Sequence, residues 1–381
     1  MSELIQSHDN RATIRWKLLT GASALALIGY VSATAAVRAE DSDRPSLWIE
    51  LGGHMEMAQG LSSPFTAPFT LLTPTPDPYR GESPTSAQRA PRYSLGLDGE
   101  ISFRPEDSDW SFSAGIRYGR SHANRHVHAQ TTIPQTTKSV CITPQYCLSY
   151  HNFHLFNKVA DTKALHSERH AVLDFQASKD IGLGLLGRDG ASSISAGVRI
   201  AQFTEKMAVD IYARPDVGIA FPTYYHVIAR DSFNQYFLHA HAARSFKGIG
   251  PSLSWSASTA LAGNAQDGEI MLDWGVDPAI LFGRQKARTA HTTSGYHFEG
   301  ISTRPPLYPA RYNHSTRARS VAVPNLGGSL GVSVKYPNAK ISIGYRYDTF
   351  LSAMDTGIDT AKKSNLTFNG PYASISIGIG N

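Results

Sequence analysis

The chain has 381 residues, of which 41% are hydrophobic and 18% are charged, and its formal net charge is +5. Residues 1–39, interpreted below as a signal peptide, contain four cations and two anions, so the remaining chain carries +3. Such a weak surplus does not indicate a nucleic-acid partner. Beyond the N-terminal segment, no stretch approaches the length of a transmembrane helix, so a membrane protein of this sequence would have to be a β-barrel.

The N-terminal segment predicts export. Arg11, Arg15 and Lys17 precede an apolar stretch at residues 18–31 that is shorter than the roughly 20 residues of a spanning helix. The sequence Val37-Arg38-Ala39 fits a cleavage site with small residues on either side of one variable position. Because a twin-arginine pair is absent, we expect the general secretory route and a mature chain of residues 40–381. An uncleaved anchor helix is the alternative.

Ten segments alternate apolar and polar residues with the period of two that is typical of β-strands. The clearest pair flanks the predicted turn Pro337-Asn338-Ala339-Lys340, where Ile341, Ile343, Tyr345 and Tyr347 alternate with polar or small residues. The ten segments are residues 46–59, 92–103, 110–118, 171–178, 194–200, 249–257, 270–277, 326–336, 341–348 and 370–380.

Short and long connections alternate between these segments. Short turns fall near residues 106, 188, 265 and 338, whereas long loops are expected at 60–90, 124–165, 207–232, 286–319 and 355–368. Outer-membrane barrels have short periplasmic turns and long extracellular loops, and an even strand number leaves both chain ends on the periplasmic side. We therefore predict an all-β protein, a transmembrane antiparallel up-and-down β-barrel of about ten strands.

The predicted location is the outer membrane of a Gram-negative cell, with outer-membrane lipid, lipopolysaccharide and the barrel assembly machinery as partners. Trp110, Trp255 and Trp274 lie on the apolar face of their segments, as expected for the aromatic girdles of such barrels. A soluble β-sandwich with aromatic residues in its core is the alternative.

If the apolar face contacts lipid, the opposite face lines the lumen, and that face carries both signs of charge. Opposite charges on neighbouring strands can pair and fill a narrow barrel. Two interpretations stay open, a packed polar plug and a narrow water-filled pore. The predicted lumen residues are Asp98, Glu100, Arg117, Asp174, Arg199, Asp273, Lys335, Arg346 and Asp348.

Two loops carry further candidate features. Cys141 and Cys147 lie six residues apart in a polar segment, which predicts a disulfide in an oxidising compartment, with metal binding as the alternative.

The predicted loop between residues 284 and 319 is basic, and lipopolysaccharide phosphates would suit its guanidinium groups. An ordinary solvated loop is the alternative. The candidate phosphate contacts are Arg284, Lys286, Arg288, Arg311, Arg317 and Arg319.

No nucleophile motif, paired-cysteine zinc signature or phosphate-binding loop is present. Histidines are frequent in the expected loops, and a metal site or a serine–histidine hydrolase site is the alternative to exposed histidines without a role. They include His122, His126, His128, His151, His154, His166 and His170. We expect neither catalysis nor a cofactor nor a bound metal. The predicted function is a structural or porin-like role; a barrel enzyme acting on envelope lipid, or an adhesin acting through its loops, are the alternatives.

Several short glycine-containing motifs resemble the Legionella-type major outer-membrane protein family. They are Ala171-Val172-Leu173-Asp174-Phe175, Lys247-Gly248-Ile249-Gly250-Pro251, Leu281-Phe282-Gly283 and Gly370-Pro371-Tyr372-Ala373-Ser374-Ile375. The resemblance spans residues 171–381. It implies an outer-membrane β-barrel with a porin-like or structural role and no catalytic residues.

Overall fold

The structure is a computed structural model, and it describes residues 47–60, 93–106, 108–130, 137–151, 159–181, 190–214, 217–220, 230–264, 267–299, 302–303 and 308–379. The predicted signal peptide and nearly all of the Pro-rich loop at residues 60–90 lie outside this part of the chain. Within it, no helix is long and apolar enough to cross a membrane.

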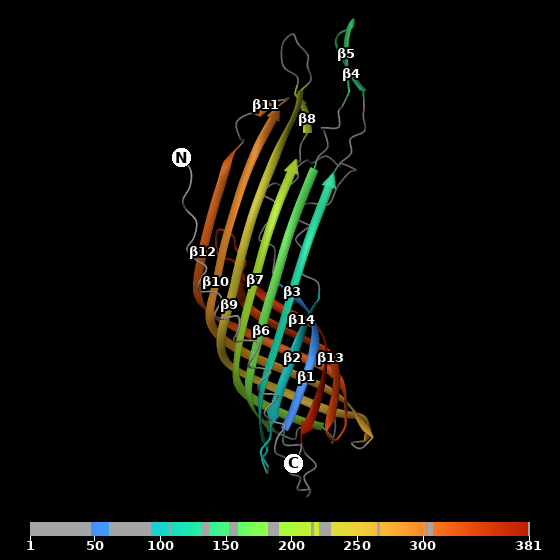
Figure 1. The fold of residues 1–381 in the computed structure, drawn as a ribbon, viewed down its shortest axis with the longest axis vertical. Helices are drawn as coiled ribbons and strands as arrows, with labels where there is room; N and C mark the ends of the chain where they lie inside the picture. Colours follow the sequence, from blue (N-terminus) through green and yellow to red (C-terminus); the bar gives the residue numbers. More distant parts are fainter. Residues whose placement is uncertain are drawn as a thin grey trace, which may run out of the picture. The chain divides into compact units, whose positions relative to one another are not determined.

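Ten antiparallel strands form a closed ring, as the sequence predicts (Figure 1). Each pairs with its neighbours in the chain, and the last pairs with the first from Leu47 opposite Ile379 to Gln59 opposite Thr367. Closure leaves no unpaired strand edge in the lower part of the ring, whereas residues 120–130 and 311–324 each pair on one side only. The ten strands are β1 (Leu47–Gln59), β2 (Ser94–Phe103), β3 (Trp110–Gln130), β6 (Val159–Asp180), β7 (Gly190–Arg214), β9 (Arg230–Asn264), β10 (Gly268–Glu299), β12 (Tyr308–Lys335), β13 (Ala339–Asp355) and β14 (Lys363–Ile379).

Four short strands lie outside the ring. β4 (Thr137–Thr143) and β5 (Tyr146–His151) form a two-stranded sheet of their own. β8 (Val217–Ala220) pairs with the start of β9, and β11 (Ser302–Thr303) pairs with the end of β10.

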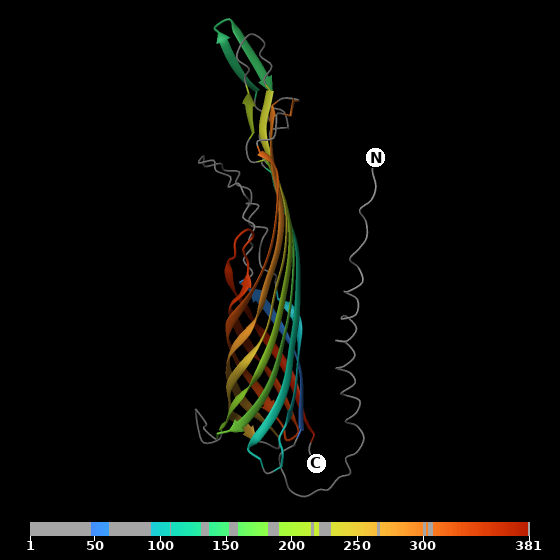
Figure 2. The same cartoon turned by 90° about the vertical axis from the view of Figure 1, so that its left-hand side faces the viewer.

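The wall of the barrel is uneven in height (Figure 2). The six neighbouring strands β3, β6, β7, β9, β10 and β12 have 21 to 35 residues, whereas β13, β14, β1 and β2 have 10 to 17. The six long strands, here called the tall wall, continue beyond the short ones at the end opposite the short turns. The predicted loops at 124–165, 207–232 and 286–319 are therefore wrong in large part, because most of their described residues are strand.

The two faces of the barrel have opposite polarity. Large apolar side chains point outward and are exposed, such as Leu97 at 70%, Ile343 at 64% and Phe282 at 58%. Charged side chains point inward and are buried, such as Arg199 at 3% and Asp348 at 1%. A water-soluble protein buries its apolar residues instead, so this inverted distribution marks a barrel whose outer surface contacts lipid.

Several of the aromatic residues that predict girdles are exposed on the outer surface of the barrel. Trp110, next to a short turn, is 47% exposed on the outer surface, and Trp255 and Trp274 contact each other edge to face at 5.0 Å between ring centroids. Tyr118, Tyr345 and Tyr347 are also exposed on the outer surface. Such rings occupy the lipid–water interface in membrane barrels.

Candidate functional site: the barrel interior

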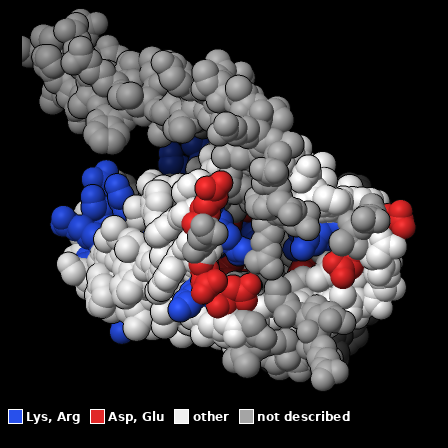
Figure 3. All heavy atoms as spheres, turned by 90° about the horizontal axis from the view of Figure 1, so that it is seen from below, with Lys and Arg blue, Asp and Glu red and all other residues white. Residues whose placement is uncertain are grey.

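The end of the barrel with the short turns contains a polar cavity of about 560 Å³. Serine side chains from β3, β6, β7 and β9 line it, among them Ser113, Ser178, Ser195 and Ser256. Serines are short, so they leave space that larger inward residues would fill. Viewed from this end, acidic and basic side chains lie side by side around a hollow (Figure 3).

Arg199 on β7 connects four strands above this cavity. Its guanidinium donates to both carboxylate oxygens of Asp174 on β6, at 2.7 and 3.1 Å. Its Nη1 donates to Asp277 Oδ1 on β10 at 2.9 Å, and also to the side-chain oxygen of Asn325 on β12. The planar fork of arginine suits this multiple contact.

Three further ion pairs surround Arg199. On β3, Arg117 pairs with the buried Asp348 of β13. Arg346 Nη1 lies 3.4 Å from Asp98 Oδ1, and Lys340 Nζ lies 2.9 Å from Asp273 Oδ2. A charge is costly to bury unless it is paired, and these contacts meet that condition.

The structure thus places seven of the nine predicted lumen residues in four ion-paired groups inside the barrel. Glu100 instead faces the cavity opposite Glu50 of β1, and Lys335 is exposed at the end with the short turns. Asp277 and Asn325 were missed. Asp277 follows the same polar alternation as Asp273 in its predicted strand, so the pattern contained the signal for it.

An apolar layer fills the barrel interior beyond the charged residues, further from the short turns. The ring centroids of Phe203 and Phe350 lie 4.5 Å apart in an edge-to-face contact. The ring of Phe246 stacks on that of Phe203, and the ring of Phe368 is tilted against it. The layer draws on eight of the ten strands, and every member is at most 2% exposed. A polar plug and a water-filled pore would both have a polar lumen, and at this height that expectation is wrong. The layer consists of Ala58, Val172, Ala201, Phe203, Phe246, Leu281, Val323, Phe350, Ala353, Met354, Leu366 and Phe368.

The connection between β13 and β14 folds inward above this layer. β13 has a bulge between Phe350 and Met354, with Ser352 at a φ of 57°, and the residues after it are buried. The tall wall binds the backbone oxygens of this connection: Arg317 donates to those of Gly357 and Ile358, at 2.8 and 2.7 Å. Further donors are Thr289 to Ile358 at 2.8 Å, Arg244 to Thr356 at 3.1 Å and Gln285 to Ser352 at 3.2 Å.

Asp355 anchors this connection and lies beyond the outward apolar residues of β13. Burial by itself raises the pKa of its carboxyl group, but hydrogen bonds from Arg317 and from the backbone N–H groups of Lys362 and Gly357 outweigh burial. The pKa of Asp355 is therefore below its ordinary value, and the carboxylate is ionised at neutral pH.

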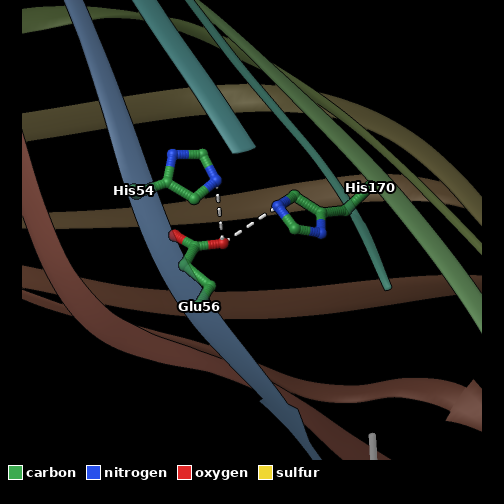
Figure 4. A group of neighbouring side chains, drawn as sticks. All are labelled: His54, Glu56 and His170. Atoms are coloured by element: carbon green, nitrogen blue, oxygen red, sulfur yellow. Dashed lines mark ion pairs between the residues drawn. The ribbon is translucent and has the colours of Figure 1, made fainter. Parts of the chain in front are cut away.

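A cluster of two histidines and one carboxylate lies beside the apolar layer (Figure 4). His54 and Glu56 come from β1 and His170 from β6, and all three side chains are buried. Glu56 Oε2 lies 3.4 Å from His54 Nε2 and 2.9 Å from His170 Nε2. Residues 122, 126, 128, 166 and 170, expected in loops, are strand residues of β3 and β6.

The predicted phosphate contacts divide between the two faces of the tall wall. Arg284, Lys286 and Arg288 of β10 are exposed on the outer surface. Arg317 and Arg319 instead turn inward, where Arg317 binds Asp355 and Arg319 Nε donates to Gln285 at 2.6 Å. Their assignment to an exterior loop is wrong, because outward and inward positions alternate along a strand. Arg311 belongs to β12, but its side chain lies outside the described part.

Cys141 and Cys147 face each other across the β4–β5 hairpin as backbone partners. Their side chains lie outside the described part of the chain. The disulfide between them stays a prediction.

The ring of strands, the apolar exterior and the charged interior define the class of this molecule, a transmembrane β-barrel. No family model and no curated protein matches the chain. The resemblance to the Legionella-type family therefore stays a prediction.

Solved structures of outer-membrane proteins are only distantly similar. The CymD monoaromatic hydrocarbon channel is 8% identical over 89% of this chain and 90% of its own, with a TM-score of 0.21. The P. putida toluene transporter TodX is 10% identical over 90% and 91%, with a TM-score of 0.20. The transport unit of the Escherichia coli autotransporter AIDA-I is 9% identical over 90% and 93%, with a TM-score of 0.21. TM-scores this low transfer no function to this chain.

Proposed function

We propose that this protein is an outer-membrane β-barrel of a Gram-negative envelope with a structural, non-catalytic role. Its barrel is a closed anchor in the bilayer, and the tall wall extends from it toward the cell exterior. The predicted signal peptide and the exposed apolar belt support the location.

The apolar layer is the observation that carries the structural role. Its twelve buried side chains come from eight strands around the ring, so they fill the cross-section between the lower cavity and the opposite end. A hydrophobic constriction of this kind excludes water and ions. We infer that the barrel does not conduct while this layer is packed.

Planar-bilayer recording of the refolded protein tests this proposal. We expect the parent barrel to be silent. A variant carrying Phe203→Ala, Phe246→Ala and Phe350→Ala removes the central rings and should show stepwise currents. Protease protection and heat-modifiable migration of the parent in the same lipid show that the silent parent is folded and inserted. Stepwise currents from the parent protein would contradict the closed-anchor proposal.

A narrow gated pore is the second candidate. The cavity with its serine lining and the polar attachment of the β13–β14 connection favour it, since hydrogen bonds to Arg317 and Thr289 can break without disturbing the ring. Currents from the parent that appear only at an applied voltage or after acidification would support this candidate.

We also propose that the outer surface of the tall wall binds lipopolysaccharide phosphates. Arg284, Lys286 and Arg288 are exposed just above the outward-facing Phe282, and Lys247 of β9 is the direct partner of Arg284. Guanidinium and ammonium groups at this height would meet the phosphates of the outer leaflet.

A thermal-shift comparison tests this contact. Lipopolysaccharide should raise the unfolding temperature of the parent, and the double variant Lys286→Ala/Arg288→Ala should lose most of that rise. The matched control Lys362→Ala/Lys363→Ala removes two exposed cations elsewhere and should keep it. An unchanged rise in the first double variant would refute the assignment.

A further inference from the structure

The cluster of His54, Glu56 and His170 has the chemistry of a metal site. Two imidazole nitrogens and one carboxylate oxygen, all within 4.8 Å of one another, converge on one point inside the barrel. His54 Nε2 and His170 Nε2 both approach the same carboxylate oxygen, Glu56 Oε2, at 3.4 and 2.9 Å. Both nitrogens are therefore directed at a common centre.

The distances suit a tetrahedral ion. Zinc binds nitrogen and oxygen at about 2.0–2.2 Å, which places tetrahedral ligands roughly 3.3–3.5 Å apart. The separation of 3.4 Å between His54 Nε2 and Glu56 Oε2 agrees with this value. The 2.9 Å between His170 Nε2 and the same oxygen would lengthen by about half an ångström as an ion enters.

The far side of each imidazole is held by a second carboxylate. His54 Nδ1 lies 3.0 Å from Asp98 Oδ2, and His170 Nδ1 lies 3.1 Å from Glu168 Oε1. Metal-binding histidines characteristically donate their other N–H to a carboxylate, which fixes the tautomer and leaves Nε2 free to bind the ion. Both histidines of this cluster have that arrangement.

The strands between the two histidines are shaped to admit the rings. β1 and β6 are separated in the ring by β2 and β3, and the paired residues across this gap are His54, Gly96, Gly119 and His170. A Cβ atom on Gly96 would overlap the His54 ring, and one on Gly119 would overlap the His170 ring. The two glycines thus provide the space in which both imidazoles lie over the barrel wall.

The surroundings exclude water. The Phe368 ring from the apolar layer lies 4.1 Å from the His170 ring between centroids, and His54, Glu56 and His170 are at most 3% exposed. A dry site strengthens the attraction between a dication and its carboxylates.

We propose that His54, Glu56 and His170 bind a first-row transition-metal dication, which ties β1 to β6 across the barrel interior. Two imidazoles and one carboxylate suit Zn²⁺ well, and they leave a fourth position for one further ligand. The site is independent of whether the barrel conducts, and it implies no reaction.

Titration of the refolded, metal-stripped barrel with Zn²⁺, followed by calorimetry, tests the proposal. We expect one ion per chain in the parent and at least a tenfold loss of affinity in His54→Gln and in His170→Gln. Glu168→Gln should lower the affinity by about 10- to 100-fold, as loss of a supporting carboxylate does at other metal sites. Binding of Co²⁺ in place of Zn²⁺ should give the visible absorption of a tetrahedral site.

His126→Gln is the matched control, because His126 is also paired with a carboxylate, Asp161, but is exposed on β3. This variant should bind Zn²⁺ as tightly as the parent. Heat-modifiable migration on gels confirms that each variant is folded. The proposal is overturned if the folded parent binds no Zn²⁺, or if His54→Gln and His170→Gln bind it as well as the parent does.

Discussion

Inside this barrel, each of the most buried charges has an opposite charge within contact distance. Arg199 is the clearest case, since it joins two carboxylates and an amide from three other strands. Removing one member of such a group leaves the others buried without compensation, and that loss costs more than the pair contributes to stability. The interior is therefore sensitive to single substitutions at the centre of its network.

Arg199→Ala should lower the free energy of unfolding by about 3 kcal/mol, at the low end for a broken buried pair, because Asp174 and Asp277 still contact the cavity. Urea unfolding in lipid vesicles measures this. Lys206→Met, at an exposed outward position on the same strand, should stay within about 0.5 kcal/mol of the parent. Equal stabilities of the two variants would contradict the role of Arg199.

The apolar face changes along long strands of the tall wall. On β7, Ile194, Ala196 and Val198 face outward in the lower part, whereas Phe203 and Val209 face inward further up. The lower part of the strand therefore contacts lipid with its apolar outward side chains. Further up, its apolar side chains pack in the barrel interior. The change marks the height at which the wall leaves the apolar belt.

Substitutions of Leu253 and Ser256 on β9 test which face of the strand is outward and which is inward. Leu253 is 57% exposed on the outer surface, and Ser256 lines the cavity. Leu253→Arg places a cation in hydrocarbon and should cost about 2–4 kcal/mol near the midplane. Ser256→Arg enters a cavity that already holds carboxylates and should cost much less. A larger loss for Ser256→Arg, measured by unfolding in vesicles, would reverse the assignment of inside and outside.

Period-two alternation predicted the existence of all ten strands and seven residues of the charge network. It failed on strand length, because it required the apolar residues to stay on one face. From Phe203 and Phe246 upward, apolar residues take the inward positions, so that requirement is not met, and residues 207–232 and 286–319 are predicted as loops. The histidine cluster was missed for a related reason. His170 was assigned to a loop, and the pairing of Gly96 with Gly119 that brings it near His54 depends on the register of four strands.

The attachment of the β13–β14 connection should depend on pH through Asp355. A carboxylate with a lowered pKa stabilises the folded state above its ordinary pKa of about 3.9, and this contribution is lost as the pH falls through the lower folded value. Protection of the amides of residues 356–362 from hydrogen exchange, corrected for the intrinsic exchange rate at each pH, should thus be kept from neutral pH to about pH 4 and fall below it. In Asp355→Asn, exchange should already be faster at neutral pH. Identical exchange in parent and variant at neutral pH would argue against this anchor.

At the scale of the whole barrel, the ten strands separate three environments. The outer belt is apolar, the lower interior is charged and contains a cavity, and the middle is closed by packed phenylalanines. An apolar exterior of this size is unstable in water, where patches of more than a few hundred Å² promote association. The fold is therefore expected to depend on lipid.

Refolding residues 40–381 from denaturant, with and without lipid vesicles, tests this dependence directly. With vesicles we expect a monomer whose strands β1 to β14 resist protease and whose gel migration changes on heating. Without lipid or detergent we expect aggregation, since Leu97, Ile343 and Phe282 would face water. Recovery of a soluble, protease-resistant monomer in plain buffer would contradict the account of this chain as a transmembrane β-barrel.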